Sequence, residues 1–358
     1  MNAKRTAREP FRLNDTRVEP GKRAVIEIPS AQLYTRTPLN IPVHVVHGRR
    51  PGPVLLVCAA IHGDELNGVE IIRRLLRMRA LQRLRGTLIA VPVVNVFGFI
   101  HKSRYLPDRR DLNRCFPGSE RGSLGSRMAW QFRTRVVEQA THVIDLHTAA
   151  VYRSNLPQIR TNLEADTNAD MAHAFGVPVI LNAALRDGSL RAAAQEQGIP
   201  VLTYEAGEAL RLEEASIRAG VRGVLNVMRH LNMLSRRTRN RTRPAPEPTV
   251  AHSSTWVRAE HDGVFRPLVA LGARIKEGRV LGRISSPFTA ADEEELVAPC
   301  DGILIGRNNQ PLVNQGEALF HIARFEEVRE VAQQLRAFRS DLRDDADPFA
   351  DDEDPIAP

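Results

Sequence analysis

The sequence is poor in cysteine, and its three cysteines form no recognisable motif. Cys58, Cys115 and Cys300 lie far apart in a chain of 358 residues, and no C-x-x-C unit occurs. So few cysteines are typical of a protein from a reducing compartment, and we expect no disulfide framework. The charged N-terminus is not followed by an apolar segment, and no stretch reaches the length of a membrane span. We therefore expect a cytoplasmic protein with no signal peptide and no membrane partner.

Aromatic residues are also scarce, at 5% of the chain, and none of the basic clusters is interleaved with them. Proteins that bind single-stranded nucleic acid combine basic grooves with stacking aromatic side chains. We therefore expect no nucleic-acid partner, although the formal net charge is +8. The basic residues concentrate near the N-terminus and at 236–243, and the C-terminal tail is acidic. Charge blocks of this kind are typical of solvated segments.

Strand-like and helix-like patterns alternate through the first two thirds of the chain. The apolar run 53–60 is typical of a strand buried on both faces, and 65–81 follows it with helical spacing of its apolar residues. Later short apolar runs alternate with further helical patterns in the same way. This alternation predicts an α/β fold with a mostly parallel or mixed sheet flanked by helices.

The pattern changes after residue 234, where arginine, threonine and proline become frequent. Beyond this stretch, short apolar runs are separated by glycine and proline, which predicts a small all-β, barrel-like domain. The chain is accordingly divided into an N-terminal arm (1–24), a catalytic domain (25–234), a linker (235–250), a β domain (251–325), a helix (326–342) and an acidic, disordered tail (343–358).

Two motifs at the ends of predicted strands offer metal ligands. His62 and Glu65 follow the apolar run 53–60, and His147 ends the short apolar strand that begins at 142. Ligands gather beyond the carboxyl ends of strands in open α/β sheets. Catalytic zinc commonly has three protein ligands and one open position for water, so these residues form a candidate site for one zinc ion. The alternatives are a favourable acid in the first turn of a helix and a buried structural histidine.

Two further segments carry polar residues suited to a substrate site. Asp111 could orient a zinc-ligating imidazole from behind, and the neighbouring Asn113 and Arg114, with Arg104 upstream, offer donors suited to a carboxylate. Glu205 follows another apolar strand, where a carboxylate can serve as a general base. Glu208 competes for that role, and surface loops remain the alternative for both segments.

Together these motifs resemble the succinylglutamate desuccinylase/aspartoacylase family of zinc carboxypeptidase-like hydrolases. The segments H-G-D-E, S-R-Y-L-P with D-L-N-R-C-F-P-G, D-L-H-T and Y-E-A-G-E occur in the family's order, and the resemblance spans about residues 40 to 325. It implies zinc ligands at His62, Glu65 and His147, and a catalytic glutamate at Glu205. It also implies that the pair Asn113 and Arg114 holds the substrate carboxylate and helps to polarise the scissile carbonyl, and Arg104 matches the family's arginine upstream of that pair.

The resulting hypothesis is a zinc-dependent deacylase that removes an acyl group from a small N-acyl amino acid. One rival is a metallocarboxypeptidase acting on peptides or cell-wall fragments with the same residues. A second rival is a non-catalytic ligand-binding protein. The sequence identifies neither the acyl group nor the oligomeric state, so a homo-oligomer stays open.

Overall fold

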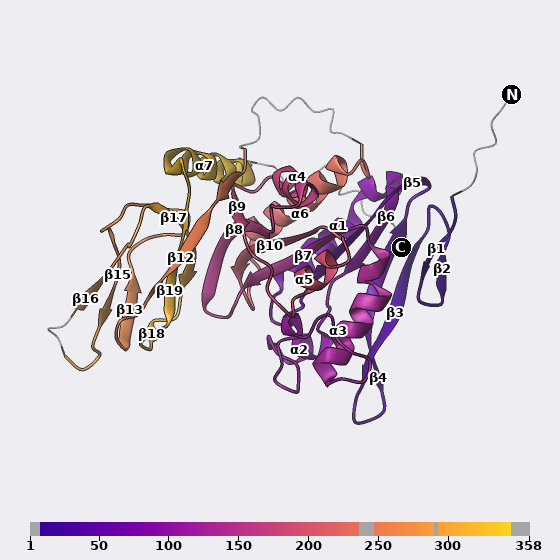
Figure 1. The fold of residues 1–358 in the computed structure, drawn as a ribbon, viewed down its shortest axis with the longest axis horizontal. Coiled ribbons are helices and arrows are strands. Elements are labelled where there is room, and N and C mark those ends of the chain that lie inside the picture. Colours follow the sequence, from indigo (N-terminus) through magenta and orange to yellow (C-terminus); the bar gives the residue numbers. More distant parts are fainter. Residues whose placement is uncertain (1–7, 236–246, 290–292, 345–358) are drawn as a thin grey trace.

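The computed structural model describes residues 8–235, 247–289 and 293–344 (Figure 1). Its helices are α1 (Asn67–Arg77), α2 (Val96–Ile100), α3 (Leu124–Arg135), α4 (Asp166–Phe175), α5 (Leu190–Gln195), α6 (Glu214–His230) and α7 (Val328–Asp344). The longest path of paired strands runs in the order β12 (Ser253–Arg258), β19 (Ala318–Arg324), β17 (Gly302–Asn308), β8 (Arg153–Thr161), β10 (Val201–Glu208), β7 (His142–Ala149), β5 (Arg50–Ala59), β6 (Arg85–Val91), β4 (Pro38–His47) and β3 (Arg23–Gln32).

The centre of this sheet is parallel and its flanks are antiparallel. Strand β5 pairs in parallel with β6 and β7, and β10 pairs in parallel with β7. The carboxyl ends of β5, β7 and β10 therefore meet at one edge of the sheet, where α/β folds place ligands. On the far side of β10, β8 runs antiparallel. The α/β fold with a mixed sheet and flanking helices that the sequence predicted is confirmed.

Helices cover both faces of the sheet because the side chains of β5 alternate between two cores. Leu55 and Val57 belong to a cluster that α1, α4 and α6 complete, whereas Leu56 and Cys58 belong to one that α3 and α5 complete. All four of these side chains are fully buried. A strand that is apolar on both faces thus reads as a continuous apolar run, which is how the sequence revealed it.

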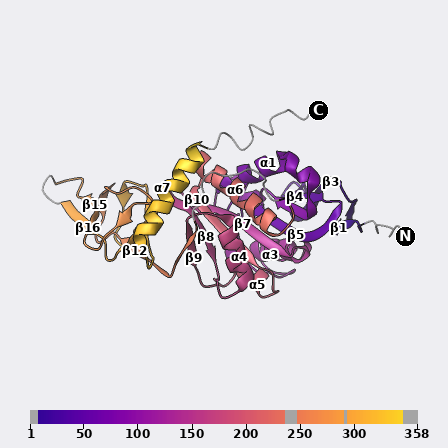
Figure 2. The ribbon, with the colours of Figure 1, turned by 90° about the horizontal axis from the view of Figure 1, so that it is seen from above.

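The C-terminal β region extends the main sheet at one end of the molecule (Figure 1). Strand β17 pairs antiparallel with β8, so β17, β19 and β12 continue the sheet of the preceding region. A separate four-stranded sheet contains β13 (Gly263–Pro267), β15 (Val280–Ser285), β16 (Glu293–Val297) and β18 (Leu312–Val313). Short strands β9 (Val179–Asn182), β11 (Thr249–Ala251) and β14 (Arg274–Ile275) attach beside the main path. Helix α7 lies across the junction (Figure 2) and contacts both α6 and β17.

Several predicted boundaries differ from those of the structure. Residues 11–13 (β1, Phe11–Leu13) and 16–18 (β2, Thr16–Val18), which we expected to form part of an arm, make an antiparallel hairpin. Leu13 and Val18 are buried, and Asn14 adopts a positive φ of 52° in the turn between the strands. Two buried side chains are too few to give a periodic signal. Within the predicted linker 235–250, residues 236–246 lie outside the described part, and Thr249 already belongs to β11. Most of the predicted tail, 345–358, is likewise outside it.

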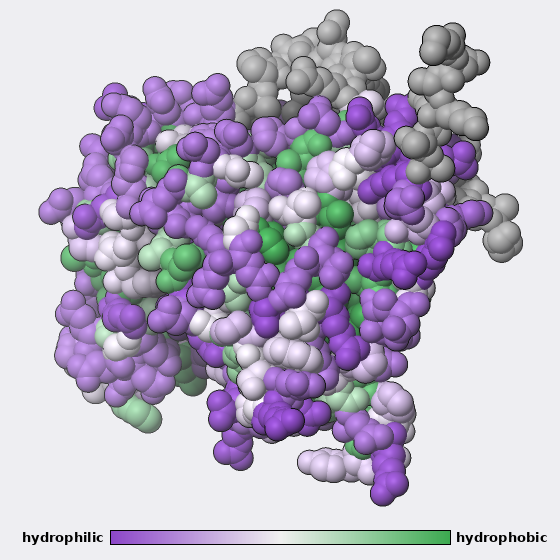
Figure 3. All heavy atoms as spheres, turned by 45° about the vertical axis from the view of Figure 1, so that its right-hand side comes forward, coloured by the Kyte–Doolittle hydropathy of each residue, from purple (hydrophilic) through white to green (hydrophobic). Residues whose placement is uncertain are grey.

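Polar residues dominate the face of the molecule shown in Figure 3, where apolar atoms appear only in small patches. Among the described residues, no helix is long and apolar enough to cross a membrane.

Candidate metal centre

Two of the three predicted metal ligands lie in the loop between β5 and α1. Ala60 adopts a positive φ of 48° directly after β5, and the backbone N–H of Glu65 donates to the carbonyl of His62 at 3.2 Å. Gly63 is required in this loop, because a β-carbon there would lie 2.0 Å from the carbonyl carbon of Gly98. This turn brings His62 and Glu65 to the edge of the sheet where β7 presents His147.

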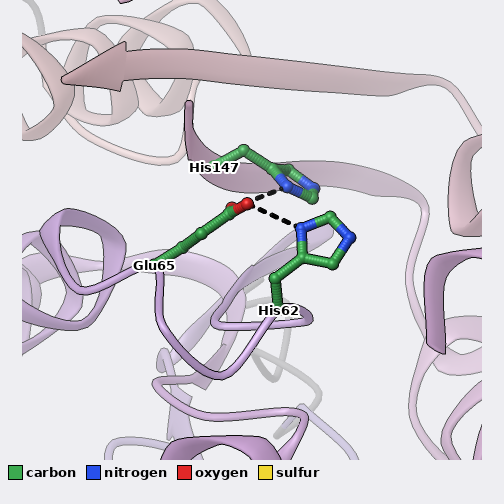
Figure 4. Close-up of side chains that lie close together, drawn as sticks. All are labelled: His62, Glu65 and His147. Carbon is green, nitrogen blue, oxygen red and sulfur yellow. Dashed lines mark hydrogen bonds and ion pairs between the residues drawn. The ribbon is translucent and has the colours of Figure 1, made fainter. Parts of the chain in front are cut away.

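His62, Glu65 and His147 form a compact, buried cluster (Figure 4). The Nδ1 atom of His62 lies 2.7 Å from Glu65 Oε1, and the Nδ1 atom of His147 lies 2.9 Å from Glu65 Oε2. One ligand atom from each residue lies within 4.8 Å of the other two. The three side chains are at most 4% exposed. The structure therefore brings together the three residues that two separate motifs predicted.

The outer ring nitrogen of each histidine meets a carboxylate. His62 Nε2 lies 3.1 Å from Asp111 Oδ1, and His147 Nε2 lies 2.7 Å from Asp145 Oδ2. A carboxylate that accepts a hydrogen bond from one ring nitrogen fixes the tautomer and directs the other nitrogen at the metal. Asp111 therefore lies where the sequence analysis expected it, behind His62, and Asp145 has the same relation to His147.

The electrostatics of the cluster favour a bound cation. Burial lowers the pKa of His147, but Asp145 and Glu65 outweigh burial and hold that pKa well above its usual value. Burial raises the pKa of Glu65, yet the two histidines more than reverse the effect and hold it well below its usual range. Two buried imidazoles thus face one buried carboxylate through their Nδ1 atoms. Two imidazole nitrogens and one carboxylate, with Asp111 and Asp145 behind the two histidines, form a ligand set that could hold a metal ion.

A pocket of about 320 Å³ opens over this cluster. Its lining includes the predicted substrate residues Arg104, Asn113 and Arg114, and the predicted catalytic residue Glu205. Asn113 is fixed because its Oδ1 accepts from the backbone N–H of Leu190 at 2.9 Å. Arg104 is held by Asp111 Oδ2, 2.9 Å from its Nη2 atom. Apart from Asp111, every site residue predicted from the sequence contributes to this lining.

The register of the sheet places Glu205 beside the cluster of His62, Glu65 and His147. In the parallel pairing of β10 with β7, Glu205 is the partner of His147. Paired residues of neighbouring strands lie about 5 Å apart and project to the same face. The Glu205 Oε2 atom accepts from Asn155 Nδ2 at 2.8 Å. Glu208, its rival, instead accepts from the backbone N–H of Tyr152 and from Asn309, and does not line this pocket.

The structure also adds pocket residues that sequence reasoning missed. Asp145 was detectable, since it lies two positions before His147 on one face of a strand. Arg160, Arg186 and Arg191 come from β8, from the loop after β9 and from α5, and no local motif connects them.

Comparison with known proteins identifies the relatives of this chain. Residues 51–231, just over half of the chain, match the Succinylglutamate desuccinylase/Aspartoacylase catalytic domain. The chain belongs to this family. Its members are deacylases, so the chain is a hydrolase that acts on amide bonds. The family predicted from the sequence motifs is confirmed.

Individual members of the family cover most of the chain. The N-alpha-acetyl-L-2,4-diaminobutyric acid deacetylase of Halomonas elongata is 27% identical over 292 residues, which are 79% of this chain and 85% of that protein. A crystal structure of succinylglutamate desuccinylase/aspartoacylase from Rhodobacter sphaeroides is 25% identical, with a TM-score of 0.76, over 85% of this chain and 96% of that one. The product-bound ectoine utilization protein EutE (DoeB) from Ruegeria pomeroyi is 24% identical, with a TM-score of 0.75, over 84% and 94% of the two chains. At 24% identity, the similarity to EutE shows a shared fold and carries no statement about activity.

Proposed function

We propose that this chain is a zinc-dependent deacylase that cleaves the amide bond of a small N-acyl amino acid. The observation that carries the proposal is the buried cluster of His62, Glu65 and His147, with Glu205 in register beside it above one pocket. The named activities of the relatives, a diaminobutyrate deacetylase among them, support the same reaction class. A pocket of about 320 Å³ is at the small end of ligand sites, which favours a small substrate over a peptide.

His62, Glu65 and His147 would hold one zinc ion. When bound, zinc supplies Lewis acidity, which lowers the pKa of a water molecule and polarises a carbonyl group. Glu205 is the base that takes a proton from the attacking water. Asn155 holds its Oε2 atom, so Oε1 is the oxygen that accepts the proton and later passes it to the departing amine.

The remaining predicted residues bind the substrate. Asn113 and Arg114 hold the carboxylate of the amino acid, for which a planar guanidinium is suited. Arg104 lies 3.4 Å from Glu65 Oε1 and is braced by Asp111, so its guanidinium is fixed next to the metal ligands. From there it stabilises the negative charge that develops on the carbonyl oxygen.

The role of Glu205 is tested with Glu205→Gln, which keeps the shape of the side chain but cannot accept a proton. We expect turnover of N-acyl amino acids to fall roughly 10²–10⁴-fold while zinc content is retained. Glu208→Gln is the matched control and should keep most of the activity, because Glu208 faces Tyr152 and Asn309. Loss of zinc in Glu205→Gln would make Glu205 a ligand, and loss of activity only in Glu208→Gln would move the role by three residues.

The metal is tested by elemental analysis of the purified protein and of ligand variants. We expect about one zinc per chain, as for other sites with three ligands and one water. His62→Ala and His147→Ala should each lose both zinc and activity. Full activity of a chelated, metal-free sample would refute the proposal.

A further inference from the structure

The end of strand β10 that carries Glu205 pairs less regularly with its neighbours than the rest of the strand does. Val201 to Glu205 pair residue by residue with β7, and the register then shifts between Glu205 and Glu208. On the other side, the pairing of β10 with β8 shifts between Glu205 and Gly207. A register shift interrupts the ladder of hydrogen bonds and lets the strand bend. The position of Glu205 therefore depends in part on contacts from outside the sheet.

Asn67 supplies such a contact from the first turn of α1. Its Nδ2 atom donates to the carbonyl of Ala206 at 3.1 Å, and its Oδ1 atom accepts from the backbone N–H of Glu213 at 2.9 Å. The side chain is 1% exposed, so both hydrogen bonds are shielded from water. Asn67 follows Glu65 by two positions, and Ala206 directly follows Glu205. Asn67 thus ties the helix that follows the metal ligands to the strand end that carries the proposed base.

Gly207 makes room for this contact. It has a φ of 78°, and a β-carbon there would lie 2.5 Å from Asn67 Nδ2 and 2.9 Å from Glu213 Oε1. A further hydrogen bond joins the same two segments, because the backbone N–H of Leu210 donates to the carbonyl of Asp64 at 2.8 Å. Three hydrogen bonds thus join residues 64–67 to residues 206–213, and Asn67 makes two of them.

The metal ligands, by contrast, have supports of their own. Glu65 Oε2 accepts from the backbone N–H of Thr148 at 3.0 Å, and each histidine is held by its outer carboxylate. Removal of the Asn67 amide should therefore loosen the strand end that carries Glu205 and leave the three ligands in place.

We propose that Asn67 is a positioning residue, which sets the place of Glu205 relative to the candidate metal centre. This inference rests on the proposed deacylase function. A general base must lie within hydrogen-bonding reach of the proton that it takes, so a small displacement of its strand slows the reaction. Asn67 does not line the pocket, and its influence on the reaction therefore passes through β10.

Asn67→Ala removes both hydrogen bonds, and Asn168→Ala is the matched control. Asn168 is also fully buried and also joins a helix, α4, to β10. Its Oδ1 atom accepts from the backbone N–H of Val201 at 3.1 Å, and its Nδ2 atom donates to the carbonyl of Asn162 at 3.0 Å. Val201 begins β10, at the opposite end from Glu205. Because the two variants lose equivalent hydrogen bonds, their thermal midpoints should fall by similar amounts.

The kinetics of the zinc-loaded proteins should separate the two variants. The substrate is the N-acyl amino acid that the unsubstituted protein turns over fastest. Asn67→Ala should lower kcat about 10-fold or more with little change in KM, because the base is displaced while the substrate contacts remain. Asn168→Ala should leave both constants nearly unchanged. Equal losses of kcat in the two variants, or an unchanged kcat in Asn67→Ala, would overturn the inference.

Zinc affinity, measured by competition with a chelating dye, should be the same in both variants. A loss of zinc confined to Asn67→Ala would overturn the inference, because Asn67 would then support the metal ligands instead of the base. Asn67→Leu, which removes the same hydrogen bonds and leaves a smaller cavity, replaces Asn67→Ala if the alanine variant does not fold. The same kinetic result is expected of it.

A double-mutant cycle with Glu205→Gln tests whether Asn67 acts through the base. In that background, Asn67→Ala should have almost no further effect on the residual turnover, because no base is left to position. A loss as large as that in the unsubstituted background would overturn the inference.

Hydrogen exchange of the metal-free proteins gives a readout that is independent of activity. The segment 204–210 should exchange faster in Asn67→Ala and not in Asn168→Ala, and unchanged exchange in Asn67→Ala would overturn the inference. If the unsubstituted protein turns over no N-acyl amino acid, the deacylase proposal fails, whereas faster exchange of 204–210 would still show that Asn67 tethers β10. If turnover is present and the two asparagine variants behave alike, the positioning role fails and the deacylase proposal stands.

Discussion

Arg114 illustrates how side-chain chemistry, beyond charge alone, sets the proposed recognition of the substrate. Its side chain is exposed at the pocket, next to Asn113, whose own amide oxygen is fixed by the backbone of α5. A guanidinium presents two parallel donors to a carboxylate, whereas an ammonium is a single point charge. The fixed amide of Asn113 beside the planar guanidinium of Arg114 therefore selects a carboxylate by its shape as well as by its charge.

Arg114→Lys should therefore lower kcat/KM about 10-fold or more, although the charge is conserved. Zinc content should not change, because Arg114 contacts no metal ligand. The measurement compares an N-acyl amino acid with its methyl ester in both proteins. We expect the loss with the acid and only a small effect with the ester, which lacks the carboxylate. Esters that react as well as acids in the unmodified protein would contradict the assignment.

At the level of single residues, the sequence identified side chains that stand next to strand ends. His62, Glu65 and His147 each follow or end an apolar run, so their position at the carboxyl edge of the sheet could be predicted. Asn155 and Arg160 could not be found in this way. Asn155 and Arg160 reach the site because β8 pairs with β10, and pairing between strands that are distant in the sequence leaves no local sequence pattern.

At the level of elements, the loop between β5 and α1 is the part of the fold on which the candidate metal site most depends. It carries two of the three proposed ligands and packs its Gly63 directly on the backbone at Gly98 and Phe99. Backbone cannot rotate away as a side chain can. This close backbone contact therefore restricts the conformation of the loop against α2, and with it the positions of His62 and Glu65.

Gly63→Ala should disturb the fold and the metal site together. A β-carbon 2.0 Å from Gly98 must displace backbone, and overpacking of this kind costs about 1–3 kcal/mol. We expect a lower thermal midpoint and at least a 10-fold loss of zinc affinity, measured by competition with a chelating dye. Gly198→Ala is the control for backbone strain, since Gly198 has a φ of 72° and a β-carbon there meets nothing within 4 Å. Zinc binding by Gly63→Ala equal to that of the control would count against this account.

Strand β8 was not predicted from the sequence, because several of its side chains are polar residues of the candidate site. Strand β8 contains Pro157 and several polar residues, so its sequence does not alternate cleanly. Its polar side chains, Asn155 and Arg160 among them, face Glu205 and the pocket. By contrast, β5 and β7 were found because they are buried on both faces. The polar residues that serve the site thus interrupt the hydrophobic pattern of β8, which carries two of the unpredicted site residues, Asn155 and Arg160.

At the scale of the whole molecule, the C-terminal β region and the catalytic region share one sheet. Strand β17 pairs with β8 on one side and with β19 on the other, so His321 of β19 lies beside Gly306 at this junction, stacked on Trp256 of β12 with ring centroids 4.2 Å apart. The sequence predicted a small β region but not its continuity with the main sheet, because the pairing joins strands about 150 residues apart (Arg307 with Ser154). Because His321 is a buried titratable group at this junction, the free energy of unfolding should depend on pH through the protonation of its imidazole.

Burial, followed by the charge of Arg160, lowers the pKa of His321 to about 3. A histidine with a lowered pKa in the folded state is protonated first in the unfolded state. The unfolded protein therefore gains protons as the pH falls below about 6.5, and stability decreases from there down to about pH 3. At pH 5 this group alone should cost roughly 2 kcal/mol of the free energy of unfolding.

His321→Phe tests this dependence, because it keeps a ring for the stack on Trp256 but has no titratable nitrogen. The free energies of unfolding of the two proteins are compared at pH 7.5 and at pH 5, both without metal, so that titration of the zinc ligands contributes equally to both. Phenylalanine also removes the contact of His321 Nε2 with Ser254 Oγ at 2.8 Å, so a constant offset between the proteins is expected. The informative quantity is the change of that offset with pH: His321→Phe should lose less stability on acidification, by roughly 2 kcal/mol. Equal losses in the two proteins would mean that His321 is protonated in the folded state, and that the junction beside β8 is more open to water than its burial implies.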